Sequence, residues 1–228
     1  DMDARFGQCL ERARRSLLNR IGNADSTRNT AIDAKENCGR PVSAQGVGYD
    51  HIDIEAADRH GVAVCICAGC NNHAVSELAF AMMLNLARHV RIADREMRDG
   101  GWPRLLGPEL WGKTLGIIGL GRVGKASALI ARGFGMRVIA TDIAWDITFA
   151  NEHGISYVPL HRLLRESDFV SIHCPLNGQT RGMIDERALE QMKPTAFLIN
   201  TARGPIVKEA ALVGALREKM IAGAGLDV

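Results

Sequence analysis

Three closely spaced glycines lie between an apolar run at residues 114–119 and a helical pattern at residues 123–133. Gly119, Gly121 and Gly124 have the spacing Gly-x-Gly-x-x-Gly. In a strand–turn–helix unit the first glycine permits a tight turn, the second lets the backbone approach a pyrophosphate, and the third allows the helix to pack closely on the strand. The N–H groups at the helix start also favour an anion. The spacing predicts a dinucleotide-binding turn; the alternative is a glycine-rich turn without a ligand.

An acidic residue follows the next expected strand. The apolar run at residues 137–141 is followed directly by Asp142. A carboxylate at this point can accept hydrogen bonds from both ribose hydroxyls and repels a 2′-phosphate, which favours NAD over NADP. The alternative is a surface aspartate with no role in nucleotide binding.

The second half of the chain alternates between strand-like and helical segments. Strands are expected at residues 114–119, 137–141, 155–158, 169–173, 196–200 and 221–227. Helices are expected at residues 123–133, 148–152, 161–166, 186–192 and 208–218. Strands separated by helices pair in parallel through right-handed crossovers. We therefore expect an α/β fold, with a Rossmann-like doubly wound parallel sheet that binds its ligand at the carboxyl ends of the strands.

The first part of the chain is less regular. Residues 1–45 contain no convincing strand, and the first clear patterns are a short helix at residues 56–60 and a strand at residues 62–66. Apolar residues then recur at helical spacing, which predicts one long helix over residues 73–99 that bridges two lobes or forms a dimer contact. The expected domains are a smaller, incomplete lobe at residues 1–72 and a dinucleotide-binding domain at residues 73–228.

Composition and charge exclude several classes of protein. Apolar residues make up 46% of the chain, which is enough for a sizeable core. The formal net charge is only +2 and the basic residues are spread along the chain, which argues against a nucleic-acid partner. No apolar run approaches membrane-spanning length, and no signal-peptide pattern is present, so we expect no membrane partner. The six cysteines lack a secretory context, which predicts reduced thiols and a cytoplasmic protein.

Three cysteines, Cys65, Cys67 and Cys70, are closely spaced. Thiols two residues apart on a strand share one face, so one interpretation is a metal site. No second pair of cysteine or histidine residues follows at a usual zinc spacing. We therefore favour buried thiols in a strand and predict no metal site.

Several segments resemble the D-isomer-specific 2-hydroxyacid dehydrogenases, in the order in which that family has them. They are LGIIGLGRVG, SDFVSIHCPLNGQTRGMI, MKPTAFLINTARGPIVKEAALVGAL and IAGAGLDV, with GVGYDHIDIEAADRHGVAV and NNHAVSELA on the substrate side. The members suggested are phosphoglycerate dehydrogenase-like and glyoxylate or hydroxypyruvate reductase-like. The resemblance implies an NAD-dependent homodimer with a flavodoxin-like substrate lobe. Its reaction would interconvert a 2-keto acid and a D-2-hydroxy acid, either 3-phosphoglycerate or a small acid such as glycerate or glycolate.

The resemblance also implies a catalytic role for Arg203, in the segment TARG after the fifth strand. Its planar cation is expected to bind the substrate carboxylate and to polarise the carbonyl oxygen; the alternative is an arginine on the solvated rim of the sheet. Val47 and Gly48 resemble the loop whose N–H groups bind the substrate carboxylate, and an ordinary turn is the alternative. The residues expected to contact the cofactor are Gly119, Gly121, Arg122, Val123, Gly124, Asp142, Cys174, Pro175, Thr180, Thr201, Ala202 and Asp227.

The family's proton donor is a histidine paired with a glutamate, and the resemblance places both after the strand at residues 221–227. The sequence ends at Val228, so we expect a chain that is truncated at its C-terminus. Two hypotheses follow: an enzyme seen as an incomplete chain, or a catalytically silent NAD(H)-binding paralogue, such as a corepressor-like redox sensor. His173, at the end of an expected strand, is interpreted as a packed side chain rather than as the proton donor.

Overall fold

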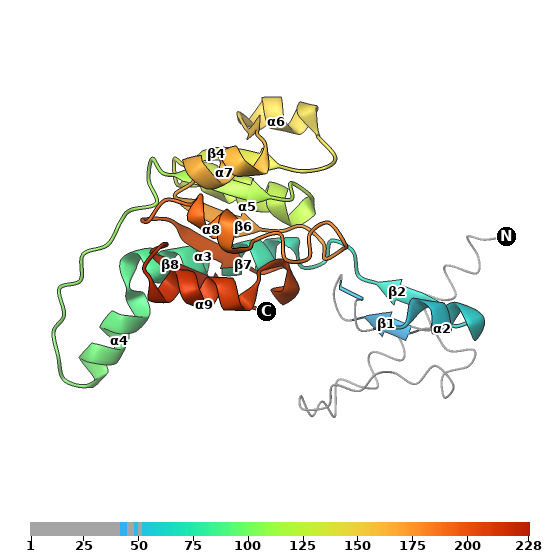
Figure 1. Ribbon diagram of the computed structural model, residues 1–228, viewed down its shortest axis with the longest axis horizontal. Coiled ribbons are helices and arrows are strands. Elements are labelled where there is room, and N and C mark those ends of the chain that lie inside the picture. The colour runs from blue at the N-terminus through green and yellow to red at the C-terminus, as the bar shows by residue number, and fades with distance from the viewer. Residues whose placement is uncertain (1–41, 45–47, 50–51) are drawn as a thin grey trace. The chain divides into compact units, whose positions relative to one another are not determined.

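The computed structural model describes residues 42–44, 48–49 and 52–228. The chain divides into two compact units, Asp1–Asn71 and Asn72–Val228 (Figure 1). None of the helices in these described residues is long and apolar enough to cross a membrane.

The described part of the first unit contains two parallel strands and a short helix (Figure 1). β1 (Val42–Ala44) pairs with β2 (Val64–Ile66). The helix α2 (Ile54–Arg59) begins directly after Asp53. The carboxylate of Asp53 accepts a hydrogen bond at 2.8 Å from the N–H of Ala56 in the first turn of this helix. Such a cap satisfies a donor that the helix itself leaves unpaired. β1 shows that the expectation of no strand within residues 1–45 was wrong. The strand is three residues long, too short for an alternating pattern to be visible.

Six parallel strands form the sheet of the second unit. They are β3 (Thr114–Ile118), β4 (Arg137–Thr141), β5 (Ser156–Tyr157), β6 (Phe169–Ile172), β7 (Phe197–Asn200) and β8 (Gly223–Leu226). Their order across the sheet is β5-β4-β3-β6-β7-β8, so the direction of winding reverses between β3 and β6. Open α/β sheets bind ligands outside the carboxyl ends of the strands at such a switch point. The predicted Rossmann-like fold is confirmed.

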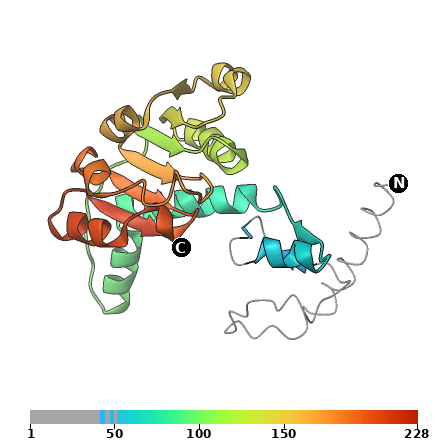
Figure 2. The ribbon, with the colours of Figure 1, turned by 45° about the vertical axis from the view of Figure 1, so that its right-hand side comes forward.

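Helices cover both faces of this sheet (Figures 1 and 2). On one face lie α3 (Asn72–Arg88), α5 (Arg122–Gly133) and α6 (Ile147–His153). On the other face lie α7 (Leu160–Glu166), α8 (Glu186–Glu190) and α9 (Glu209–Arg217). Successive side chains of a strand point to opposite faces. Ile117 therefore packs on the face covered by α3, α5 and α6, and Ile118 packs on the face covered by α7, α8 and α9. The central strands β3, β6 and β7 are buried throughout because both of their faces are covered.

A break separates α3 from a second helix, α4 (Val90–Arg98), so the expectation of one helix over residues 73–99 was wrong. His89 lies between the two helices with a φ of 54°, in the left-handed region. The side chain of Asn85 accepts a hydrogen bond from Arg91 N at 2.9 Å. This side-chain acceptor caps the start of α4, so the break leaves that N–H satisfied. The apolar spacing of the sequence continues across the break, which is why it indicated a single helix.

Small residues in β8 let α3 lie close to the sheet. A Cβ atom at Gly225 would stand 3.0 Å from the Cβ of Met82, and one at Gly223 would stand 3.3 Å from the Phe197 ring. Both separations are shorter than the optimum for carbon atoms. A larger side chain at Gly225 would push α3 away, and one at Gly223 would press on Phe197 of β7 and lie 3.5 Å from Leu86 of α3. The glycines of β8 therefore serve helix–sheet packing.

Candidate functional site

The glycine turn between β3 and α5 combines close backbone packing with an open face. Gly119 adopts a φ of 94°, and a Cβ atom added to it would stand 2.6 Å from Cys174 N. A Cβ atom at Gly124 would stand 2.2 Å from Gly119 O. In contrast, a Cβ atom at Gly121 would meet nothing within 4 Å. The turn therefore leaves space at the N-terminus of α5, where a phosphate group fits.

The carboxylate of Asp142 lies against the same turn. Its Oδ2 accepts a hydrogen bond from Leu120 N at 2.6 Å, and its Oδ1 accepts one from Ala144 N at 3.0 Å. The Trp145 indole N–H donates to the Asp142 carbonyl oxygen at 2.9 Å, and the indole stacks on Tyr157 with ring centroids 4.9 Å apart. These contacts hold the acid beside the glycine turn, where a ribose-binding carboxylate is needed.

Two contacts position the first turn of α5. The hydroxyl of Ser76 in α3 donates to Val123 O at 3.1 Å, which joins the two helices near the glycine turn. Lys125 Nζ forms an ion pair with Asp146 at 2.5 Å and lies 4.9 Å from the centroid of the Phe149 ring. The hydrogen bond from Lys125 lowers the pKa of Asp146, so this carboxylate is charged at neutral pH. The N-terminus of α5 is thus held from both sides.

The segment after β6 lies next to the switch point. Burial raises the pKa of the Cys174 thiol to about 11, so this half-buried group is neutral. Thr180 Oγ1 donates to Pro175 O at 2.7 Å and accepts a hydrogen bond from Asn177 N at 2.8 Å. Local hydrogen bonds therefore fix the conformation of the loop from Pro175 to Thr180.

The His173 side chain contacts two buried serine hydroxyls between β6 and α5. Its Nε2 lies 2.9 Å from Ser171 Oγ and 3.2 Å from Ser127 Oγ. Burial of the imidazole lowers its pKa to about 4, so the ring is neutral at physiological pH. His173 is a packed, hydrogen-bonded side chain, as the sequence predicted.

The segment after β7 brings Thr201, Ala202 and Arg203 to the same edge of the sheet. Asn200, which is only 1% exposed, braces this segment: its Oδ1 accepts a hydrogen bond from Ala202 N at 3.0 Å, and its Nδ2 donates to Arg203 O at 2.9 Å. The Arg203 guanidinium donates to Ala202 O at 2.6 Å. Among the described residues, Thr201 Oγ1 is a buried polar atom without a hydrogen-bond partner. Buried polar groups normally have a partner, and a bound ligand can supply one.

Asp227 completes this edge, because its N–H donates to Asn200 O at 3.0 Å. All the predicted cofactor contacts therefore lie in segments that follow the carboxyl ends of β3, β4, β6, β7 and β8. Of the two residues predicted to bind the substrate carboxylate through N–H groups, Gly48 is half-buried in the first unit. Val47 lies outside the described residues.

Sequence reasoning missed the polar residues that position these segments. Asn200 and Ser171 each stand in an apolar strand, FLIN and FVSI, and Ser127 is buried in α5. A buried polar side chain must find a hydrogen-bond partner, so a polar residue within an apolar run is the available signal. The partners themselves come from segments distant in the sequence, and no local pattern indicates them.

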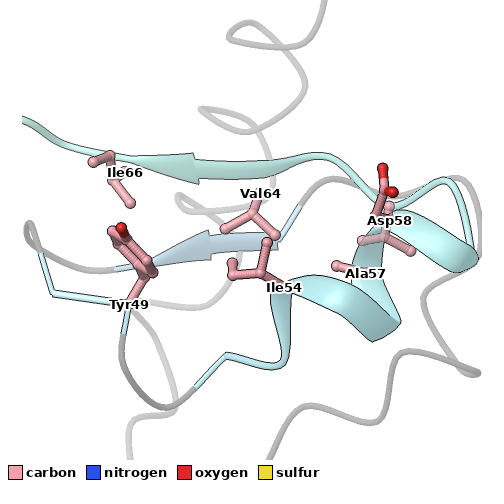
Figure 3. Close-up of a pocket in the computed structure, with 7 residues that line it drawn as sticks. Tyr49, Ile54, Ala57, Asp58, Val64 and Ile66 are labelled. Carbon is pink, nitrogen blue, oxygen red and sulfur yellow. The ribbon is translucent and has the colours of Figure 1, made fainter. Parts of the chain in front are cut away.

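The first unit contains a pocket of about 410 Å³ (Figure 3). Its lining residues are Tyr49, Ile54, Ala57, Asp58, Val62, Val64 and Ile66. These residues include no cation, and Asp58 would repel a carboxylate. The pocket is therefore a poor candidate for binding an acidic substrate.

The clustered cysteines do not form the buried strand that was expected. Cys65 is half-buried in β2, whereas Cys67 and Cys70 lie beyond the strand and are exposed. The strand ends at Ile66, so Cys67 lies outside it and does not share a strand face with Cys65. Within residues 42–44, 48–49 and 52–228, no group of three or more His, Cys, Asp or Glu side chains could hold a metal ion.

A family model matches most of the second unit. Residues 80–228 match the D-isomer specific 2-hydroxyacid dehydrogenase, NAD binding domain. The chain belongs to this family. NAD is therefore the cofactor, as the position of Asp142 predicted. The residues present fit it, because the glycine turn offers space for phosphates, a carboxylate lies beside that turn, and the buried Thr201 hydroxyl lacks a partner within the described structure.

Relatives and solved structures of this family resemble most of the chain. The glyoxylate reductase of Korarchaeum cryptofilum is 46% identical over 83% of this chain and 59% of its own length. The glyoxylate reductase of Thermococcus onnurineus is 40% identical over 96% of this chain and 70% of its own length. The apo-structure of D-lactate dehydrogenase from Escherichia coli has a TM-score of 0.78 at 35% identity, and covers 82% of this chain and 60% of that one. D-Lactate dehydrogenase from Aquifex aeolicus, complexed with NAD and lactic acid, has a TM-score of 0.75 at 35% identity, and the match covers 82% of this chain and 57% of that one. The chain thus spans about 59% of the length of the first relative.

Proposed function

We propose that this chain forms the NAD-binding domain and part of the substrate lobe of a reductase that interconverts a small 2-keto acid and its D-2-hydroxy acid. Glyoxylate and glycolate are the favoured pair, because relatives at 40% and 46% identity are glyoxylate reductases. We assign residues 73–228 to the NAD-binding domain and residues 1–72 to the substrate lobe. The division of the chain into compact units at Asn71 supports this assignment.

The position of Arg203 is the observation that carries the proposal. This cation lies directly after β7, at the edge of the sheet that also carries the glycine turn. When bound, reduced NAD supplies a hydride to the carbonyl carbon of the substrate. Negative charge then develops on the carbonyl oxygen beside a fixed carboxylate, and a guanidinium stabilises both because its donors form a planar fork. Asn200 holds the backbone on both sides of this residue, so the cation is presented from a rigid segment.

We assign the remaining predicted contacts as follows. Arg122 and Val123 would offer backbone N–H groups to the pyrophosphate, and Cys174 and Pro175 would line the adenosine side. Thr180 would lie near the cofactor, Thr201 and Ala202 near the nicotinamide, and Asp227 would bind the carboxamide. Val47 and Gly48 would bind the substrate carboxylate. The location of the predicted cofactor contacts at one edge of the sheet supports their assignment.

The proton for the substrate oxygen does not come from His173. Its imidazole bonds to two serine hydroxyls, and its pKa of about 4 leaves it without a proton to donate at neutral pH. A general acid contributes roughly 10²- to 10⁴-fold to such a reaction. Turnover by this chain therefore distinguishes the enzyme from the second candidate, an NAD(H)-binding protein without catalysis.

The decisive test compares Arg203→Ala with a control, Arg217→Ala, at an exposed position at the end of α9. NADH binding is measured by fluorescence, and glyoxylate reduction by loss of NADH absorbance. We expect Arg203→Ala to lower turnover by about 10²- to 10³-fold and to leave NADH affinity unchanged, while the control matches the original chain. Equal turnover by both variants would refute the role of Arg203.

If the original chain binds NADH but does not reduce glyoxylate, the same variants are tested with oxamate, an unreactive analogue of a 2-keto acid. Oxamate that binds to the NADH complex only when Arg203 is present supports the substrate site and assigns the loss of turnover to the proton-transfer step. Absence of oxamate binding favours the catalytically silent nucleotide-binding protein.

We also propose a homodimer in which α4 and the following residues 99–112 contact a second copy. None of the residues of α4 is buried, and Met97, Trp102 and Leu106 are 52%, 78% and 94% exposed. Apolar side chains of this size on one segment are typical of an interface. Light scattering should give a mass near twice 24.8 kDa, and Leu106→Asp should reduce it toward the monomer. A mass of one chain for the unmodified protein would refute the dimer.

We place the protein in the cytoplasm. The described cysteines, Cys65, Cys67, Cys70 and Cys174, are all thiols rather than disulfides. Thiols of this kind persist in a reducing compartment. Fractionation of cells followed by immunoblotting tests this assignment.

A further inference from the structure

Two exposed thiols lie on the segment that joins the two compact units. Cys67 follows β2 directly, and Cys70 comes just before the boundary at Asn71. Cys70 N–H donates to Cys67 O at 3.5 Å, and Cys70 Sγ lies 3.0 Å from the same oxygen. Gly69 between them has a φ of 90°, a conformation that glycine adopts without strain. The four residues therefore form a turn that brings the two cysteines together.

The geometry of this turn suits a disulfide. The ends of a β-turn lie within about 7 Å of each other between Cα atoms, and disulfides bridge Cα atoms about 4.4–6.8 Å apart. The side chain of Cys70 already lies against Cys67, because its Sγ is 3.0 Å from the Cys67 carbonyl oxygen. Both side chains are exposed, so a reagent in solution can reach either sulfur.

We propose that Cys67 and Cys70 form a reversible redox pair on this connecting segment. The oxidant is a low-molecular-weight disulfide, RSSR. One protein thiolate attacks RSSR and releases RS⁻, which gives a mixed disulfide; the second thiolate then displaces the other RS⁻. The protein loses two hydrogen atoms and gains one S–S bond, while RSSR is reduced to two RSH. Excess RSH reverses both steps.

The other described cysteines are less suited to this chemistry. Cys65 is half-buried in β2. Cys174 is half-buried in the second unit, so a reagent reaches its sulfur less readily than the exposed sulfurs of Cys67 and Cys70. A metal site is not supported, since no group of three potential ligands occurs in the part of the chain that the structure describes.

The bond would change the mechanics of the connecting segment. A short covalent ring between Cys67 and Cys70 restricts the backbone dihedrals of the two residues that it encloses. α3 begins at Asn72, two residues after the ring, so the restriction reaches the start of the helix on which Ser76 contacts the glycine turn. Oxidation should therefore slow amide exchange of residues 68–72, whereas the amides of β3 should be unaffected.

The test treats the chain with oxidised glutathione and measures its intact mass, with fragmentation to locate the bond. The variants are Cys67→Ser and Cys70→Ser, and the matched control is Cys65→Ser, which removes the neighbouring thiol from β2. NADH binding of the reduced variants, measured first, verifies that each is folded. We expect the original chain and the control to lose two hydrogen atoms through a Cys67–Cys70 bond. Each of the other two variants should instead retain a mixed disulfide with glutathione.

Two outcomes would overturn the proposal. One is a bond from Cys67 or Cys70 to any other cysteine, including Cys65. The other is a stable mixed disulfide on the original chain at these positions, since the second thiol would then have failed to displace glutathione. Zinc added to the reduced chain provides a further check, because stoichiometric zinc binding that depends on both thiols would make the pair a metal site. None of these results depends on the proposed reaction, so the two hypotheses fail separately.

Discussion

The N–H of Leu120 donates to Asp142 Oδ2 at 2.6 Å. The acid that follows β4 is therefore bonded to the glycine turn that follows β3. The bond is made between residues that are distant in sequence but adjacent at the edge of the sheet. It orients a carboxylate whose oxygens keep further lone pairs for the hydroxyls of a ribose.

Replacement of Asp142 by Asn should weaken NADH binding by about 10- to 100-fold, the range expected when hydrogen bonds to a charged group are lost. The preference for NADH over NADPH should narrow, because the charge that repels a 2′-phosphate is removed. Fluorescence titration with both nucleotides measures the effect. Glu152→Gln, at an exposed position on α6, is the control. An unchanged ratio of the two affinities would contradict the role of Asp142.

Two glycines of the same helix should respond in opposite ways to alanine. A Cβ atom at Gly124 would stand 2.2 Å from Gly119 O, so the glycine turn must move, and we expect Gly124→Ala to lower the free energy of unfolding by about 1–3 kcal/mol. It should also weaken NADH binding. Gly133 has nothing within 4 Å of its Cβ position, so Gly133→Ala should be neutral or stabilising by up to about 1 kcal/mol. Urea denaturation compares them, and equal destabilisation would show that packing at the turn is not the cause.

His173 should make stability depend on pH. Burial lowers its pKa from 6.5 to about 4 in the folded state. Between these values the unfolded chain binds a proton that the folded chain does not, so the free energy of unfolding falls with falling pH. The stabilisation is complete above pH 6.5, and up to about 3 kcal/mol is lost on approaching pH 4. His173→Gln lacks this titration. Urea denaturation should therefore show that the free energy of unfolding of this variant is lower than that of the original chain at pH 7, and that the difference becomes smaller at pH 5. A constant deficit would mean that the imidazole is not buried as described.

Asn200 offers a second pH-dependent test. Asn200→Asp keeps an acceptor for Ala202 N but places a carboxylate oxygen against Arg203 O, so we expect a loss of about 1–3 kcal/mol in the free energy of unfolding at pH 7. Burial raises the pKa of the new carboxyl, and once protonated it can donate to that carbonyl. Stability relative to the original chain should therefore recover on acidification. Asn151→Asp, on an exposed turn of α6, should show no such recovery in the same denaturation series.

Most of the second unit could be predicted because its signals are local. The glycine spacing, the acid after β4 and the apolar runs between helices are each contained within a few residues. β1 was missed because it is three residues long and depends on β2 for its hydrogen bonds. The break at His89 was missed because it changes the direction of the backbone without changing the apolar spacing.

The site was predicted less completely than the fold. Residues that face a ligand follow a recognisable spacing, whereas those that hold them in place do not. The hydroxyls of Ser127 and Ser171 meet at His173 only because the fold brings a residue of α5 next to the end of β6. In the same way, the exposure of Cys67 depends on where β2 stops pairing, and the sequence contains no signal for that point.

Trp145 places a natural chromophore beside Asp142. Its indole donates to the Asp142 carbonyl oxygen, stacks on Tyr157 and is still 61% exposed. The emission of an indole responds to its hydrogen bonds and to nearby water, and it overlaps the absorption band of reduced nicotinamide. Binding of the nucleotide can therefore be followed by the intrinsic fluorescence of the protein, without a label and without a substrate.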